Sequence, residues 1–195
     1  MNKTIHRQGE TATKIFDNRR LEVDYSTIVP LLKTGMKVLD VGCGTGAISK
    51  GIADHVGRTG YVIGIDKTEH FILSGKETYK DVSNLTLLHA DLFKYEPVEK
   101  FDLIVAARVL QWLSNPKEAL RKLKSLLKPG GQLSILDYNH DALEWSPQPP
   151  ESMQIFYKAF LKWRADAGMN NRIAEDLAAY FSESDFQSIE VNNAD

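Results

Sequence analysis

Short apolar segments alternate with helical patterns through the middle of this 195-residue chain. Each helical stretch, such as Ala47 to about His55 or Asn115 to Leu127, separates two segments that have the pattern of buried strands. Repeated β-α-β units with short connections predict a parallel sheet with helices on both faces. The chain should therefore adopt an α/β, doubly wound, mostly parallel fold, with strands at residues 37–41, 61–66, 85–90, 101–107 and 132–136.

Composition excludes several classes of protein. The formal net charge is −2, from 24 basic and 26 acidic side chains, so no nucleic-acid partner is expected. Cys43 is the single cysteine, which leaves no disulfide framework and no cysteine-cluster zinc site, and no metal is expected. The longest apolar run near the middle, Leu103 to Ala107, is far too short to span a bilayer. We therefore expect a cytoplasmic protein without a membrane partner.

The segment that follows the first strand is a glycine-rich loop. Gly42, Gly44 and Gly46 allow a tight turn and a close approach of the backbone to a ligand, at the amide end of the next helix. The same loop also fits a dinucleotide fingerprint, because Ala47 completes its pattern. A tight turn without any ligand is the third interpretation. The loop alone does not choose among them.

Three aspartates distinguish between these possible ligands. Asp40, Asp66 and Asp91 lie 26 and 25 residues apart, and each falls at or beside the end of a strand. In an open parallel sheet these positions share the carboxyl edge, where ligands bind. Three carboxylates suit a cationic ligand rich in hydrogen-bond donors, and they would repel a pyrophosphate. The row of acids favours S-adenosylmethionine over a dinucleotide, although Asp40 and Asp91 could also serve as local turn caps.

Five segments between Thr34 and Tyr138 resemble the motifs of the class I S-adenosylmethionine-dependent methyltransferases. The matching segments are residues 38–46, 64–66, 89–93, 101–105 with 109–113, and 126–133. The layout is similar to the "type 11", quinone-biosynthesis-like branch that acts on small molecules. Ala106-Ala107-Arg108 follows the fourth strand in place of Asn-Pro-Pro-Tyr, which argues against methylation of DNA bases or glutamine.

The resemblance implies cofactor-binding roles for named residues. The methionine end of the cofactor would be held by Asp40, Gly42, Gly44 and Gly46. The ribose would contact Asp66, and the adenine would lie among Lys67, Ala90, Asp91 and Leu92. Near the methionine and the sulfonium, the pocket would be lined by Ala107, Arg108 and Trp112. Tyr25 or Arg20 could reach the carboxylate of the cofactor.

The resemblance also frames the domain organisation. We expect one methyltransferase domain over residues 1–195, with an N-terminal helical lid (1–33), a cofactor-binding core (34–138) and a C-terminal lid (139–195). Residues 5–32, 151–167 and 172–181 should be helical, and residues 186–191 should form a last strand. The family's sheet normally has seven strands, so the final strand is apparently missing. An open sheet edge invites pairing, and a homodimer is one expectation.

The acceptor and the chemistry at the acceptor are not set by these motifs. A stripe of Ile155, Phe156, Ala159, Phe160 and Trp163 should pack against the core, or alternatively line an acceptor pocket. A general base, if one is needed, could be Tyr138 or His140, while Asp137 could pair with Arg108 or stabilise a charged acceptor. No catalytic residue is assigned. A nicotinamide-dependent oxidoreductase and a non-catalytic cofactor-binding protein are the alternatives to a small-molecule methyltransferase.

Overall fold

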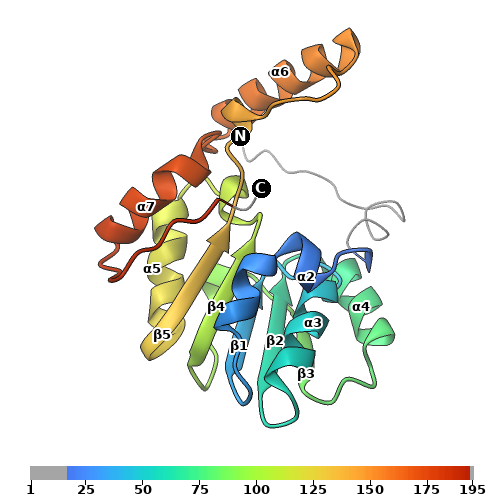
Figure 1. Ribbon diagram of the computed structural model, residues 1–195, viewed down its shortest axis with the longest axis vertical. Coiled ribbons are helices and arrows are strands. Elements are labelled where there is room, and N and C mark those ends of the chain that lie inside the picture. Colours follow the sequence, from blue (N-terminus) through green and yellow to red (C-terminus); the bar gives the residue numbers. More distant parts are fainter. Residues whose placement is uncertain (1–16, 194–195) are drawn as a thin grey trace.

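A computed structural model of the protein describes residues 17–193 and shows an α/β fold around one parallel sheet (Figure 1). The sheet has five strands in the order β3-β2-β1-β4-β5, and every neighbouring pair is parallel. The strands are β1 (Lys37–Val41), β2 (Tyr61–Asp66), β3 (Leu85–His89), β4 (Phe101–Ala107) and β5 (Leu127–Leu136). The predicted doubly wound fold is confirmed.

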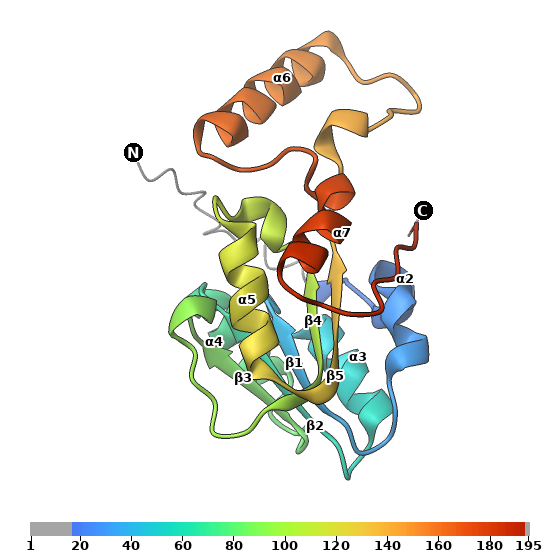
Figure 2. The same ribbon diagram turned by 90° about the vertical axis from the view of Figure 1, so that its left-hand side faces the viewer.

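Helices cover both faces of this sheet (Figure 2). One face carries α2 (Leu21–Asp24), the 3₁₀ helix η1 (Ser26–Leu31), α3 (Ala47–Val56) and α4 (Glu69–Thr78). The other face carries α5 (Pro116–Leu126) and α7 (Ile173–Glu183), which pack together. Two buried apolar clusters result, one on each face, and β1 and β4 contribute to both of them. This double burial explains why the central strands are almost continuously apolar.

The strand order brings the ends of β1, β2 and β4 to one edge. Val41 lies opposite Ile65, and Asp66 lies opposite His89, so consecutive strands end almost level with each other. Three short 3₁₀ helices extend from this edge: η2 (Leu92–Lys94), η3 (Leu110–Trp112) and η4 (His140–Ala142). The glycine loop and the loops after β2, β3 and β4 are therefore neighbours, as the sequence predicts.

The N-terminal expectation is only partly met. Within the described residues, a one-turn helix α2 and the 3₁₀ helix η1 replace a continuous helix up to residue 32. Pro30 lies inside η1, where a ring without an N–H cannot support α-helical hydrogen bonds. Residues 5–16 lie outside the described part of the chain, so this portion of the predicted helix stays a prediction.

The expected last strand at residues 186–191 is wrong. No residue of this segment is in a strand; Asp185 and Ser188 have φ values of 57° and 55°, which an extended strand does not allow. Lys124 Nζ instead donates to the carbonyl oxygens of Ser184 and Asp185, and Phe186 packs on Phe181 with ring centroids 4.9 Å apart. The segment closes the end of α7 against α5, and within residues 17–193 the sheet ends at β5.

The predicted packing of the aromatic stripe against the core is also wrong, because none of its residues belongs to either buried cluster. The stripe lies on α6 (Glu151–Asp166), which projects away from the sheet in both views (Figures 1 and 2). Ile155 and Phe156 are 62% and 63% exposed, and Arg164 is the one buried side chain of this helix. Among residues 17–193, no helix has the length and apolar character needed to cross a membrane.

Candidate functional site

The glycine loop between β1 and α3 has a conformation that only glycine adopts easily. Gly42, Gly44 and Gly46 have φ values of 71°, 59° and 86°, all in the left-handed region. A Cβ atom on Gly42 would also lie 2.5 Å from the Val109 side chain, so this position has no room for another residue. The three glycines thus bring the loop backbone close to the start of η3.

Asp40 lies at the end of β1, almost completely buried at 4% exposure. Ser49 Oγ on α3 donates a hydrogen bond to Asp40 Oδ2 at 2.6 Å. Burial raises the pKa of Asp40 to about 7, and the Ser49 hydrogen bond and the charge of Arg19 act in the opposite direction. Its carboxyl group can therefore change its protonation state near neutral pH, which makes it sensitive to a nearby positive charge.

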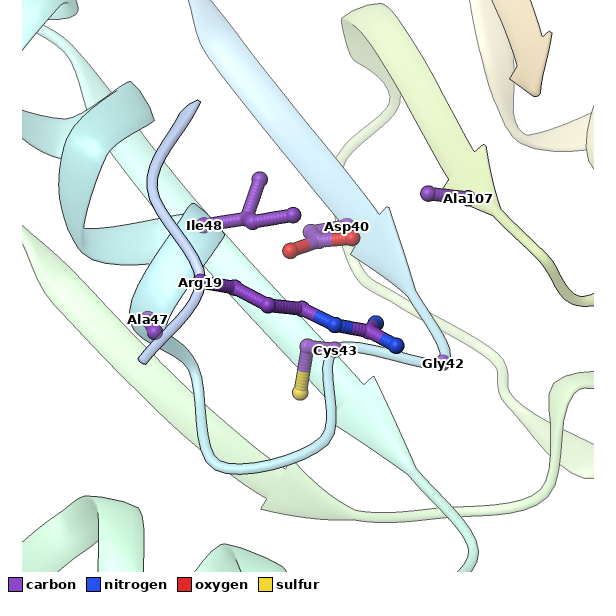
Figure 3. A pocket seen from close by; sticks show the side chains of 7 residues that line it. All are labelled: Arg19, Asp40, Gly42, Cys43, Ala47, Ile48 and Ala107. Atoms are coloured by element: carbon purple, nitrogen blue, oxygen red, sulfur yellow. The ribbon is translucent and has the colours of Figure 1, made fainter. Parts of the chain in front are cut away.

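A small pocket lies over Asp40 and the first residues of the glycine loop (Figure 3). Its lining residues are Arg19, Asp40, Gly42, Cys43, Ala47, Ile48 and Ala107. Figure 3 shows the Arg19 side chain passing beside Asp40 and extending toward Gly42. The pocket thus contains a buried acid, a guanidinium and exposed loop backbone. This combination suits the carboxylate and ammonium of an amino-acid group.

Asp66 links the end of β2 to the glycine loop. Its Oδ2 accepts from the backbone N–H of Gly44 at 3.0 Å, and its Oδ1 accepts from that of Thr68 at 2.8 Å. One carboxylate therefore fixes the loop and caps the turn into α4. Asp66 remains partly exposed, so its oxygens can also face a ligand at this edge.

The residues expected around the adenine lie one strand further along. The backbone N–H of Ala90 donates to the Asp66 carbonyl, so the end of β3 is tied to the end of β2. Asp91 Oδ1 accepts from the Phe93 N–H at 2.8 Å, the turn-capping role that the sequence left open. Leu92 is buried, while Lys67 is exposed. Together with Asp66, these residues form a second group beside the pocket rather than part of its lining.

The loop after β4 forms the opposite wall. Ala107 lines the pocket, and Arg108 follows it with a φ of 60°, a strained conformation for a residue other than glycine. The guanidinium of Arg108 lies 4.0 Å from Asp24 and stacks over the Tyr138 ring at 5.2 Å. Trp112 lies further out on η3, with its ring 6.2 Å from that of Phe160 on α6.

Asp137 and His140 belong to hydrogen-bond networks around η3. Asp137 Oδ2 accepts from the Leu110 N–H at 3.1 Å, and burial raises the pKa of Asp137 to about 7. His140 bonds to Gln111 through Nε2 and to Tyr157 through Nδ1, and burial lowers its pKa to about 4. At neutral pH His140 is therefore uncharged and already occupied on both ring nitrogens. The Arg108 guanidinium pairs with Asp24 rather than with Asp137, although its charge acts to lower the pKa of Asp137.

The N-terminal residue that reaches the pocket differs from both expected candidates. Tyr25 is buried, and its hydroxyl donates to the Ser134 carbonyl at 2.8 Å, on the β5 side of the sheet. Arg20 is exposed, whereas its neighbour Arg19 lines the pocket. Sequence reasoning missed Arg19 because no local pattern distinguishes it from Arg20. Only the direction of the chain before α2 decides which arginine faces inward.

Known proteins are similar in sequence to this chain over most of its length. Residues 32–188 match the family model described as a methyltransferase domain. Demethylmenaquinone methyltransferase of Staphylococcus aureus is 32% identical over 175 residues, covering 83% of this chain and 72% of that protein. The protein of the same name from Staphylococcus saprophyticus is 30% identical, covering 83% of this chain and 75% of that protein.

Solved structures share the fold. An S-adenosylmethionine-dependent methyltransferase from Aquifex aeolicus superposes with a TM-score of 0.68 at 25% identity, over 91% of this chain and 88% of that chain. The N-methyltransferase NodS from Bradyrhizobium japonicum, solved with S-adenosylhomocysteine, gives 0.53 at 24% identity, over 66% and 67%. The chain belongs to the S-adenosylmethionine-dependent methyltransferases of the class I fold. The nicotinamide alternative is thereby set aside.

Proposed function

We propose that this enzyme binds S-adenosylmethionine along the carboxyl edge of the sheet, with the methionine end in the Asp40 pocket. The observation that carries this placement is the joint lining of one pocket by Asp40, Gly42 and Ala107, from β1, the glycine loop and β4. Asp66 lies next along the edge for the ribose, and the Ala90–Leu92 group follows for the adenine. The order of residues along the edge matches the order of groups along the cofactor.

Arg19 extends this proposal beyond the residues that the motifs mark. A methionine group carries an ammonium and a carboxylate, and the pocket presents Asp40 for the first and Arg19 for the second. The two side chains lie close enough for the charge of Arg19 to act to lower the Asp40 pKa. In the proposed complex each side chain would contact one charged group of the ligand, and the segment before α2 would thereby contribute to the cofactor site.

For the acceptor, we propose a quinone-like small molecule, of the type named in the relatives. Aromatic side chains lie beside Arg108 and on η3, namely Tyr138 under the guanidinium and Trp112 near Phe160, and flat rings stack favourably on such groups. The bound cofactor supplies an activated methyl group, and the protein orients donor and acceptor in line and excludes water. The loops and helices of residues 17–33 and 139–193 would act as lids around this space.

The proposal is tested first by binding and then by turnover. Calorimetry should show S-adenosylhomocysteine binding to the purified chain, and NADH should show none. Mass spectrometry should then detect methylation of demethylmenaquinone or a short-chain analogue. Binding of S-adenosylhomocysteine without turnover on any quinone would remove the acceptor proposal but keep the cofactor site. Stabilisation by NADH alone would contradict both.

Three further expectations stay predictions. A homodimer is proposed on the unpaired outer edge of β5, since no strand among residues 17–193 lies beyond it. Sedimentation at several concentrations tests this, and a monomer at every concentration would contradict it.

A cytoplasmic location and the lack of a nucleic-acid partner rest on composition alone. Fractionation of cells and a DNA-binding titration are the corresponding measurements.

A further inference from the structure

Arg164 is a buried cation on a helix that is otherwise turned toward solvent. It is 0% exposed, although α6 contributes no other buried side chain. Burying a guanidinium is costly unless hydrogen bonds replace its water. Such a residue in the last turn of a projecting helix therefore requires specific partners.

The partners of Arg164 lie on η3 and on the turn before α7. Its Nη2 donates to the backbone carbonyl of Gln111 at 2.8 Å and to that of Asn170 at 3.3 Å. Its Nε donates to Asn171 Oδ1 at 2.8 Å. The guanidinium also lies over two neighbouring rings, 5.0 Å from the centre of Trp112 and 5.6 Å from that of Phe160. One side chain thus joins α6, the α6–α7 turn and η3.

The short helix η3 is held from the other directions as well. Asp137, at the end of β5, accepts the Leu110 N–H at the start of η3. The Gln111 side chain bonds to His140, which bonds in turn to Tyr157 on α6. A three-residue helix cannot hold itself in place by internal hydrogen bonds. Its position is set by the buried Leu110 side chain and by these outside groups, and among the latter Arg164 contacts both a backbone carbonyl and the Trp112 ring.

The position of η3 matters because of what precedes it. Ala107 lines the pocket, and Arg108 is kept at a φ of 60°. Strained backbone of this kind persists only where the surrounding structure fixes it. If η3 shifts, the strain at Arg108 can relax and the wall of the pocket moves. The contacts that Arg164 of α6 makes with η3 therefore affect the position of the pocket wall formed by Ala107 and Arg108.

We infer that Arg164 is a positioning residue, which couples the orientation of α6 to the wall formed by Arg108 and Trp112. The inference rests on the proposed function, since it takes that wall to face the cofactor and the acceptor. Arg164 itself does not touch the ligands. Its role is to fix Trp112 and, through η3, the backbone of Arg108 when the lid is in place.

The test combines two variants, a control and two readouts. Arg164→Lys keeps a charge but cannot hold Gln111 and Asn171 together, and Arg164→Met removes the charge while keeping an apolar stem. Lys162→Met is the control, because Lys162 lies on the same helix, is exposed and pairs only with Asp166. The first readout is function, measured as kcat and KM for the acceptor and as affinity for S-adenosylhomocysteine. The second is the fluorescence of Trp112, with Trp145 and Trp163 replaced by Phe.

We expect Arg164→Lys to lower kcat at least tenfold with less than a threefold change in affinity for S-adenosylhomocysteine, and to shift the Trp112 emission to the red. Lys162→Met should change neither. Unchanged kcat and unchanged emission in both Arg164 variants would overturn the inference, and so would unfolding of both, because Arg164 would then serve the fold alone. The emission of Trp112 needs no turnover, so it still tests Arg164 if the proposed acceptor fails.

Discussion

At the scale of single residues, Arg19 is the side chain whose proposed role is easiest to isolate. Replacing Arg19 with alanine should weaken binding of S-adenosylhomocysteine at least tenfold, about 1.4 kcal/mol, because a charge-assisted hydrogen bond to the carboxylate is lost. Binding of 5′-methylthioadenosine, which lacks the amino-acid group, should stay within twofold. Arg20→Ala is the matched control, since Arg20 is exposed beside it. Calorimetry with both ligands measures the difference, and equal losses for the two ligands would exclude a carboxylate contact.

Asp40 gives a prediction about pH. Its pKa is raised by burial to about 7, so lowering the pH from 8 to 6 protonates it in the free enzyme. A neutral carboxyl group no longer attracts the ligand ammonium, so affinity should fall by up to about tenfold per pH unit below the pKa. Asp40→Asn should bind weakly at every pH with a flat profile. Isothermal titrations of S-adenosylhomocysteine from pH 5.5 to 8.5 would measure how the affinity depends on pH. An affinity that still changes with pH in Asp40→Asn would point to another titrating group.

Asp66 tests the neighbouring part of the same edge. Asp66→Ala should weaken S-adenosylhomocysteine binding at least tenfold, about 1.4 kcal/mol, if the carboxylate contacts the ribose. Asp66 also holds the Gly44 and Thr68 N–H groups, so the melting temperature should be recorded in parallel. Glu69→Ala, at the first residue of α4, provides an exposed acidic control. An unchanged affinity would refute the ribose role.

At the scale of elements, the glycine loop depends on a helix that contacts it from behind. Gly75 of α4 is buried, and a Cβ atom there would lie 2.1 Å from the backbone oxygen of Thr45 in the loop. Gly→Ala in a helix normally stabilises a protein slightly. Here we expect Gly75→Ala to destabilise by about 1–3 kcal/mol, because α4 must move off the loop. Urea denaturation measures this change, and Lys76→Ala at the exposed neighbouring position is the control. An increase in stability for Gly75→Ala would show that the loop can move away from the added methyl group at no cost.

Helices and strands were predictable where the apolar pattern of the sequence alone determines which residues are buried. Strands β1, β2 and β4 have the predicted ends because apolar runs bounded by turn residues leave one interpretation. Strand β5 begins earlier than predicted, at Leu127, which pairs with Phe101 of β4. The turn signal of residues 128–131 coincides with a shift in register, after which pairing resumes at Gln132. The helical pattern of α6 was predictable, but its exposure was not. A helical stripe does not say whether a core lies against it.

The residues of the candidate site also fall into a predictable and an unpredictable group. Asp40, Asp66 and the three glycines were predictable because each follows directly from a strand end, and strand ends in a parallel sheet meet at one edge. Arg19 and Arg164 were not, because they reach η3 or the pocket from segments far away in sequence. Their neighbours Arg20 and Lys162 have similar chemistry but face solvent. Only tertiary packing separates each functional candidate from its neighbour.

At the scale of the whole molecule, stability should come from the sheet and its two helical layers rather than from α6. Phe156→Ala should change the free energy of unfolding by less than about 1 kcal/mol, because Phe156 is 63% exposed. Leu123→Ala, in the buried face of α5, should cost about 2–5 kcal/mol. Chemical denaturation compares the two. A large loss for Phe156→Ala would mean that another surface covers α6 in solution.

The pairing of β1 with β4 has a consequence for how the protein reaches its native state. Val38 lies opposite Leu103, 65 residues away, and both β2 and β3 fall within the intervening chain. Such distant parallel pairing lengthens the mean separation of contacting residues, which slows folding. The pocket takes Asp40 from one of these strands and Ala107 from the other, so it exists only after this pairing has formed. In a refolding experiment, recovery of S-adenosylhomocysteine binding should therefore coincide with the slowest phase of the return of native structure.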